Sequence, residues 1–147
     1  MSFGYVPSDS EGKYKEMIEY GIDHWNSWRD SMRGLPAGEY IDLSTLTMTS
    51  CDMSGGDFSD CVFSSARLTG SDCSNANFRN AILRGADLRG VNLEGADLTD
   101  ADLTGANLSG AILVAADLRG AKLDGANLEG AIFTQEELDA LRLLELE

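Results

Sequence analysis

The sequence predicts an all-β solenoid, because residues 41–135 repeat every five residues, nineteen times in succession, without an insertion or deletion. One position of each repeat, here named position i, is Leu in twelve repeats, Phe in four, Met in two and Cys in one. Position i−2 is Ala in twelve repeats, and position i−1 is Asp or Asn in twelve. Neither the helical period nor the two-residue period of a flat strand matches this spacing. Residues two apart on an extended segment face the same way, so i−2 and i point inward and i−1 points outward.

The other two positions of each repeat, i+1 and i+2, are predicted to turn the chain. Position i+2 is Gly in ten repeats and Asn in two, and both residues tolerate the positive φ that a type II turn requires at its third residue. If each repeat is one side of a square, four repeats make a coil, and coils about 4.8 Å apart give a rod about 23 Å tall. We expect type II corners from Gly85 to Gly130, and more type I-like corners in residues 41–75, where i+2 includes Thr45, Ser50, Asp60 and Ser65.

The run ADLRG VNLEG ADLTD ADLTG ANLSG (residues 86–110) resembles the pentapeptide-repeat proteins. The resemblance covers about two-thirds of the chain and implies a right-handed quadrilateral parallel β-helix, here of just under five coils. The amino-terminal repeats depart from the ideal pattern at i−2, where the residues are Ile41, Leu46, Cys51, Gly56 and Ser71.

Residues 1–40 form an amino-terminal segment, within which residues 11–33 predict an amphipathic helix ended by Gly34-Leu35-Pro36. Its apolar residues recur at helical spacing: Met17, Tyr20 or Gly21, His24 or Trp25, Trp28 and Met32. A solenoid leaves unpaired strand groups at its ends, so we expect this helix to cap the first coil through Trp25 and Trp28. The pattern GxxxWNxWR also resembles leader segments of some bacterial pentapeptide-repeat proteins.

Residues 136–147 are predicted to form a short carboxy-terminal helix. Thr134 and Glu137 have the spacing of a capping box, and Leu138, Leu141 and Leu144 follow among other apolar residues. A helix this short is marginal alone, so its leucines must pack on something. Two alternatives stay open: the helix caps the last coil, or it pairs two subunits into a homodimer. The final Leu-Glu pair also fits a cloning scar.

The sequence predicts no catalytic residue, no cofactor site and no metal site, so the chain is not expected to be an enzyme. Its one histidine, His24, falls in the cap helix, and no glycine-rich loop ends in Gly-Lys-Ser/Thr. Asp97, Asp100 and Asp102 gather near one corner, but outward carboxylates are expected from the repeat and do not define a calcium site. Three cysteines at inward positions are expected to be buried free thiols.

Composition predicts one cytoplasmic domain whose partner is a protein. The net charge of −14 argues against nucleic acid and anionic membranes as partners, and neither a signal segment nor a long apolar run is present. Outward residues are the candidate contacts: Ile112, Val114 and Ile132, which break the repeat, on one side, and the acidic row of Asp97, Asp100 and Asp117 on another. Leu138, Leu141 and Leu144 are candidate contacts of the tail.

Two functions remain after these exclusions, and the first is favoured. It is a rigid protein–protein interaction module whose partner the sequence does not name. The alternative follows from the family resemblance: quinolone-resistance members are acidic, dimeric rods thought to occupy the DNA site of gyrase. That likeness implies an acidic DNA mimic that binds DNA gyrase or topoisomerase and modulates quinolone sensitivity. This chain shares the acidity, but it is shorter and lacks the loop insertions of some of those proteins.

Overall fold

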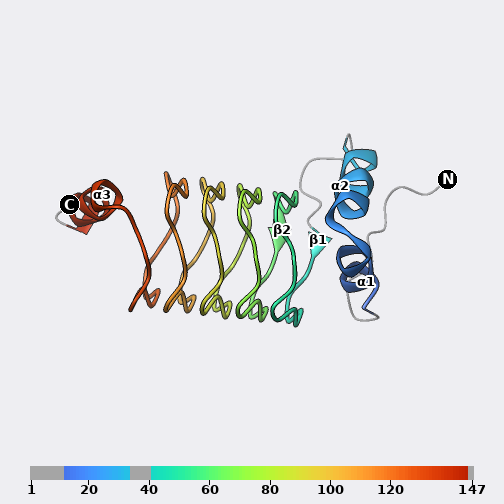
Figure 1. Ribbon diagram of the computed structural model, residues 1–147, viewed down its shortest axis with the longest axis horizontal. Coiled ribbons are helices and arrows are strands. Elements are labelled where there is room, and N and C mark those ends of the chain that lie inside the picture. The colour runs from blue at the N-terminus through green and yellow to red at the C-terminus, as the bar shows by residue number, and fades with distance from the viewer. Residues whose placement is uncertain (1–11, 34–40, 146–147) are drawn as a thin grey trace.

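The chain forms a rod of stacked coils with helices at both ends (Figure 1). The computed structural model describes residues 12–33 and 41–145, with side chains described as far as residue 141. The elements in chain order are α1 (Lys13–Tyr20), α2 (Ile22–Ser31), β1 (Ile41–Asp42), β2 (Cys61–Val62) and α3 (Gln135–Glu145). Helices α1 and α2 lie against the first coil, and α3 lies beside the last coil.

Parallel pairing at a constant offset of 20 residues builds the rod. Strands β1 and β2 pair in parallel with Ile41 opposite Cys61, and isolated bridges repeat the same offset as far as Ile112 opposite Ile132. Each turn of the ladder uses the same bonds, such as Leu43 N–H to the Val62 carbonyl at 2.6 Å. The predicted four repeats per coil are therefore confirmed.

The predicted phase of the repeat is also confirmed by burial. Every residue at position i from Leu43 to Leu113 is at most 2% exposed, and the alanines at i−2 from Ala66 to Ala111 are at most 1% exposed. From Ala116 to Phe133 the same two positions are only partly buried, although they pack against the core. The core is thus a continuous column whose carboxy-terminal end is less well covered.

All eighteen corners from residue 45 to residue 130 have one backbone conformation, which corrects the expected division into two types. The third corner residue has φ between 53° and 63° at the eight non-glycine positions, and between 65° and 74° at the glycines. A type I corner requires negative φ there, so that expectation is wrong. Identical stacked sides impose the same corner throughout, and non-glycine residues adopt it at a cost of about 1 kcal/mol each.

The amino-terminal segment forms two helices, not the single helix expected over residues 11–33. Gly21 separates α1 from α2 with φ of 149° and ψ of 144°, a conformation that ends one helix and begins the next. The buried face is Tyr14, Ile18 and Trp25, whereas Tyr20 is 81% exposed. Residue 11 and the predicted stop at residues 34–36 lie outside the described residues.

Within residues 12–33 and 41–145, no helix is both long enough and apolar enough to cross a membrane.

Candidate interaction surfaces

Helix α2 closes the open edge of the first coil with polar side chains. The Asn26 amide accepts the Asp57 N–H at 2.8 Å and donates to the Gly55 carbonyl at 3.0 Å. The Trp25 indole N–H donates to the Asp57 carbonyl at 2.7 Å, and Arg29 donates to the Ser59 carbonyl at 2.6 Å. Asp57 N–H, Asp57 C=O and Ser59 C=O are the ladder groups that a preceding coil would bond. The side chains of α2 therefore stand in for a missing strand.

Aromatic packing joins the same helix to the core of the rod. The ring centroids of Trp25 and Phe58 are 5.4 Å apart, and Phe58 stacks on Phe78 at 5.4 Å. Trp28 is partly buried, and its ring centroid lies 5.2 Å from that of Trp25. Trp25, and not Trp28, forms the ring contact with Phe58. Gly56 stands at i−2 beneath this helix, and a Cβ there would meet the Phe58 ring first, with Cζ at 2.7 Å, and then Ile22 Cδ1 at 2.8 Å. The small residue at position 56 thus makes room for the Phe58 ring and for α2.

The outward Asp and Asn residues have a structural role that the sequence reasoning missed. In all twelve repeats with Asp or Asn at i−1, its Oδ1 accepts the backbone N–H of position i+1, as in Thr99 N–H to Asp97 at 2.9 Å. In an inner repeat such as residues 96–100 the other four N–H groups bond to backbone carbonyls, so this side chain satisfies the fifth. An Asx turn of this kind is a known local preference of both residues, and its two-residue spacing was visible in the sequence.

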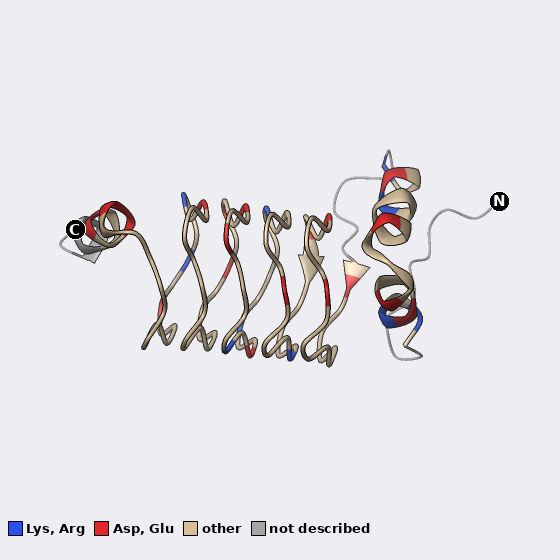
Figure 2. Cartoon of the chain, viewed as in Figure 1, with Lys and Arg blue, Asp and Glu red and all other residues tan. Residues whose placement is uncertain are grey.

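The acidic side of the rod is the row Asp57, Asn77, Asp97 and Asp117, paired one above another by bridges. Asp117 binds Arg119 at 2.6 Å, and Asp57 lies 3.4 Å from Arg33. Hydrogen bonds from the Arg119 side chain and backbone hold the pKa of the Asp117 carboxyl below its usual value. Asp100 is exposed at a neighbouring corner with φ of 59°. Figure 2 shows that acidic residues on the rod are interspersed with basic ones.

The isoleucine patch, defined as Ile112, Ile132 and Val114, lies on the side that adjoins the acidic side. Ile112 and Ile132 are bridge partners on successive coils, and Ile132 is 51% exposed. In most repeats an Asp or Asn at i−1 accepts the N–H of position i+1, but Ile112 has no acceptor atom in its side chain. The Val114 N–H therefore donates no hydrogen bond within the described residues. Val62 and Ile82 form a similar bridge pair on the opposite side of the rod.

Helix α3 begins where the chain leaves the ladder, and Glu137 fixes its start. Thr134 N–H donates to Glu137 Oε2 at 3.2 Å, and Glu137 N–H donates to Thr134 Oγ1 at 3.2 Å, which is the expected capping box. Glu137 Oε1 also accepts the Ala115 N–H at 2.5 Å. In earlier coils that N–H would bond a carbonyl of the next coil. Helix α3 is thereby tied to one corner of the last complete coil.

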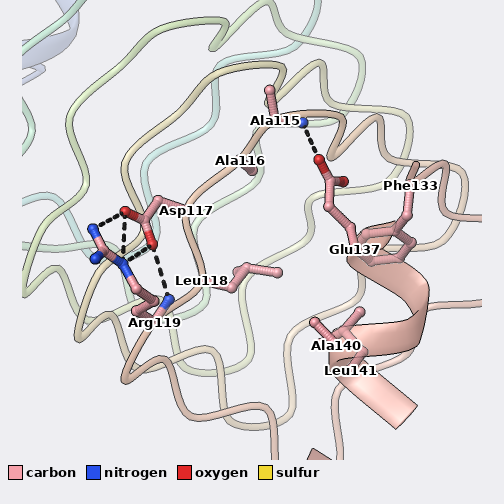
Figure 3. A pocket seen from close by; sticks show the side chains of 9 residues that line it. All are labelled: Ala115, Ala116, Asp117, Leu118, Arg119, Phe133, Glu137, Ala140 and Leu141. Carbon is pink, nitrogen blue, oxygen red and sulfur yellow. Dashed lines mark hydrogen bonds and ion pairs between the residues drawn. The ribbon is translucent and has the colours of Figure 1, made fainter. Parts of the chain in front are cut away.

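A groove of about 420 Å³ separates α3 from the rod (Figure 3). Its floor is the segment from Ala115 to Arg119, and Phe133, Glu137, Ala140 and Leu141 form its walls. Leu138 is partly buried, and the side chain of Leu144 lies outside the described residues. Of the two predicted tail contacts whose side chains are described, Leu141 lines this groove and Leu138 does not.

The cysteines do not form a reactive centre. Cys61 and Cys73 are buried free thiols, as expected, whereas Cys51 is half-buried. Desolvation raises the pKa of Cys61 to about 12 and also raises the pKa of Cys73, so neither thiol ionises near neutral pH. Beside Cys51, the buried Ser71 hydroxyl donates to the Met48 carbonyl at 2.9 Å and accepts the Cys51 N–H at 3.1 Å. Ser71 thus bridges a corner whose usual backbone bond is missing.

Comparison with known proteins identifies the family. A model described as pentapeptide repeats matches residues 57–95 and 96–135 in eight copies, and the chain belongs to this family. The fold is similar to the pentapeptide repeat protein Rfr23 from the cyanobacterium Cyanothece 51142, with 32% identity over 69% of each chain and a TM-score of 0.65. It is also similar to alr5209 from Nostoc PCC 7120, with 45% identity over 56% of this chain and 68% of that one, and a TM-score of 0.55.

A third similar structure is QnrB1, described as a plasmid-mediated fluoroquinolone resistance protein. Its identity is 18% over 81% of this chain and 74% of that chain, and the TM-score is 0.27. That likeness is too low to carry an argument about function. A search of curated protein sequences gave no match. Proteins of the pentapeptide repeat family are right-handed β-helices that generally serve as structural or interaction modules.

Proposed function

We propose that this protein is a non-enzymatic interaction module: a right-handed quadrilateral β-helix of just under five coils that presents a partner-binding side. The isoleucine patch carries the proposal. Twelve repeats use Asp or Asn at i−1 to bond a backbone N–H, and Ile112 gives up that bond to place an apolar side chain outward. Its neighbour Ile132 is 51% exposed. An exposed isoleucine stacked on a partly exposed one, beside an N–H that Ile112 leaves without an acceptor, favours contact with another protein.

The test replaces Ile112 and Ile132 together by Asn, the residue found at i−1 in many other repeats. The Asn that replaces Ile112 supplies an acceptor for the Val114 N–H, while the Thr134 N–H keeps Glu137 as its acceptor. The double change leaves the net charge unaltered, so we expect the rod to stay folded. Capture of partners from an extract of the source cell, followed by cross-linking and mass spectrometry, compares this variant with the wild type. Ile82→Asn on the opposite side is the matched control. We expect the double variant alone to lose the partner, and undiminished capture by it would exclude the patch.

The acidic DNA mimic is the second candidate, supported by the row of carboxylates on the acidic side. Residues 41–135 carry thirteen acidic and six basic side chains, a net charge of −7. Spread over a rod about 23 Å tall, this is roughly one charge per 3 Å, whereas duplex DNA has one per about 1.7 Å. Asp117 and Asp57 also have arginine partners. The charge density therefore ranks mimicry below the interaction module.

Gyrase supercoiling, measured with and without a fluoroquinolone at micromolar protein, tests the DNA-mimic function directly. Protection or inhibition that disappears in Asp97→Asn and Asp117→Asn would favour mimicry, because these changes keep the backbone hydrogen bond and remove only charge. Unchanged supercoiling in both conditions would exclude it.

A further inference from the structure

The last coil lacks one side, and the groove beside α3 occupies its place. Residues 116–118 form a side whose preceding neighbour is residues 96–98, as the bridge from Asp97 to Asp117 shows. At the usual offset of 20 residues the next side would be residues 136–138, but these lie in α3. The groove is lined by Ala116, Leu118 and Arg119 on the rod. It is therefore the empty position of one extended segment.

The backbone N–H and C=O groups of residues 116–120 are placed to bond a further parallel strand. In the coil before, Leu98 N–H and Asp100 N–H donate to the carbonyls of the following coil at 2.8 and 2.9 Å, and the Ala96 carbonyl accepts an N–H from it at 2.9 Å. The equivalent groups are Leu118 N–H, Gly120 N–H and the Ala116 carbonyl. Within the described residues these three make no such bond. They present two donors and one acceptor in the register of a parallel ladder.

The walls of the groove define the side chains that fit. On the acidic side of the rod, Ala96 and Leu98 point inward with an outward Asp between them. Ala116 and Leu118 continue these two columns and are only partly buried, and Leu141 and Phe133 enclose them from the far side. Figure 3 shows Leu118 facing the space between the rod and α3. A segment with a small residue, an outward polar residue and a Leu in succession would extend both columns.

We propose that the groove is a strand-addition site that binds an extended segment of a partner protein, with the pattern small–polar–leucine, parallel to residues 116–120. Its central residue donates to the Ala116 carbonyl and accepts from Leu118 N–H, and the carbonyl two residues later accepts from Gly120 N–H. Main-chain bonds give affinity and the two inward side chains give specificity, as in other cases of β-augmentation. This inference rests on the proposed interaction function and adds to it the site and the chemistry of the partner.

The probe is the peptide Gly-Ala-Asp-Leu-Arg-Gly, which has the sequence of residues 85–90. Amide hydrogen exchange measured by NMR on the full chain reports the site, because Leu118 and Gly120 should exchange at least about tenfold more slowly with peptide near 1 mM. Leu123 and Gly125, equivalent amides on the next side of the same open coil, are an internal reference and should not change. The same peptide with an N-methyl group on Asp cannot donate to the Ala116 carbonyl and should give no protection.

Two variants distinguish peptide binding in the groove from binding elsewhere at the carboxy-terminal end of the rod. Ala140→Trp fills the groove from α3 and should abolish protection, whereas Asp139→Trp adds the same bulk at an exposed residue that does not line the groove. Absence of protection, equal protection of both pairs of amides, or equal binding by Ala140→Trp overturns the proposal. Protection without peptide that rises with protein concentration, together with a dimer in light scattering, assigns the groove to a second copy instead. None of these results alters the isoleucine-patch test, so the two proposals fail independently.

Discussion

Replacing Asn26 by Ala tests whether a side chain can serve as the missing strand at the amino-terminal end. The Asn26 side chain accepts the Asp57 N–H at 2.8 Å and donates to the Gly55 carbonyl at 3.0 Å, and it is half-buried between α2 and the first coil. Each bond contributes about 0.5–1.5 kcal/mol net. Loss of both should therefore lower the free energy of detaching the cap from the rod by about 1–3 kcal/mol.

The assay uses the position of the two tryptophans, Trp25 and Trp28, which are the only ones in the sequence and lie in α2. Their fluorescence follows the cap during denaturant unfolding, while far-ultraviolet circular dichroism at strand wavelengths follows the rod. In Asn26→Ala the fluorescence midpoint should fall and separate from the dichroism midpoint, since contacts between coils are unaffected. A stacked-repeat protein permits such local unfolding.

Two controls accompany this variant. Ser27→Ala changes an exposed neighbour on the same helix and should leave both midpoints in place. Asn26→Asp keeps the acceptor for Asp57 N–H but loses the donor to Gly55, so its effect should lie between those of the other two. If the free energies of detaching the cap in Asn26→Ala and Ser27→Ala agree within about 0.3 kcal/mol, water replaces the amide and edge capping by Asn26 is refuted.

Three further predictions concern the rod. Asp97→Ala should destabilise it by about 0.5–1.5 kcal/mol in chemical denaturation, while Asp97→Asn keeps the acceptor and should be neutral; equal losses would refute the Asx role. Ala115→Gly should raise the free energy of unfolding by about 1 kcal/mol, because Ala115 has φ of 61°; no gain would show that the corner is unstrained. Hydrogen bonds from Arg89 and Arg119 lower the pKa values of Asp87 and Asp117 below 3.8, so their stabilisation is complete above about pH 4 and is lost as pH falls through the folded values. Carboxyl titration by NMR should give both pKa values below 3.8, and normal values would contradict the pairing.

The corners show where reasoning from residue types stops. Thr45 and Ala115 are poor candidates for positive φ by preference, yet they adopt it because the stacked sides leave one corner geometry. Backbone bonds from each corner to the next coil, such as Asp100 N–H to the Arg119 carbonyl at 2.9 Å, hold that geometry. Residue preference therefore predicted the corner correctly at Gly and Asn and wrongly where the ladder overrides it.

The helix break at Gly21 has a different cause. A continuous amphipathic pattern over residues 11–33 is compatible with one helix, and Gly is tolerated within a helix at a cost of about 1 kcal/mol. Gly21 takes up φ of 149°, a conformation open to glycine, so the chain ends α1 and begins α2 at this residue. Tyr14 and Ile18 of α1 and Trp25 of α2 are all buried. These three residues would share one face of a continuous helix as well, so the apolar pattern does not distinguish one helix from two.

The sequence by itself determined the solenoid and the phase of its repeat, whereas the four-repeat coil was expected from the family resemblance and is shown by the offset of 20 residues between paired segments. A five-residue pattern is local information repeated nineteen times, so every repeat supports the same assignment. Tertiary structure alone decided how the two ends are finished, because the groups involved are far apart in the chain. The hydrogen bond between Asn26 and Asp57 joins residues 31 apart in the sequence, and the one between Glu137 and Ala115 joins residues 22 apart. No local sequence pattern predicts these two hydrogen bonds, because they depend on where each helix lies against the end of the ladder.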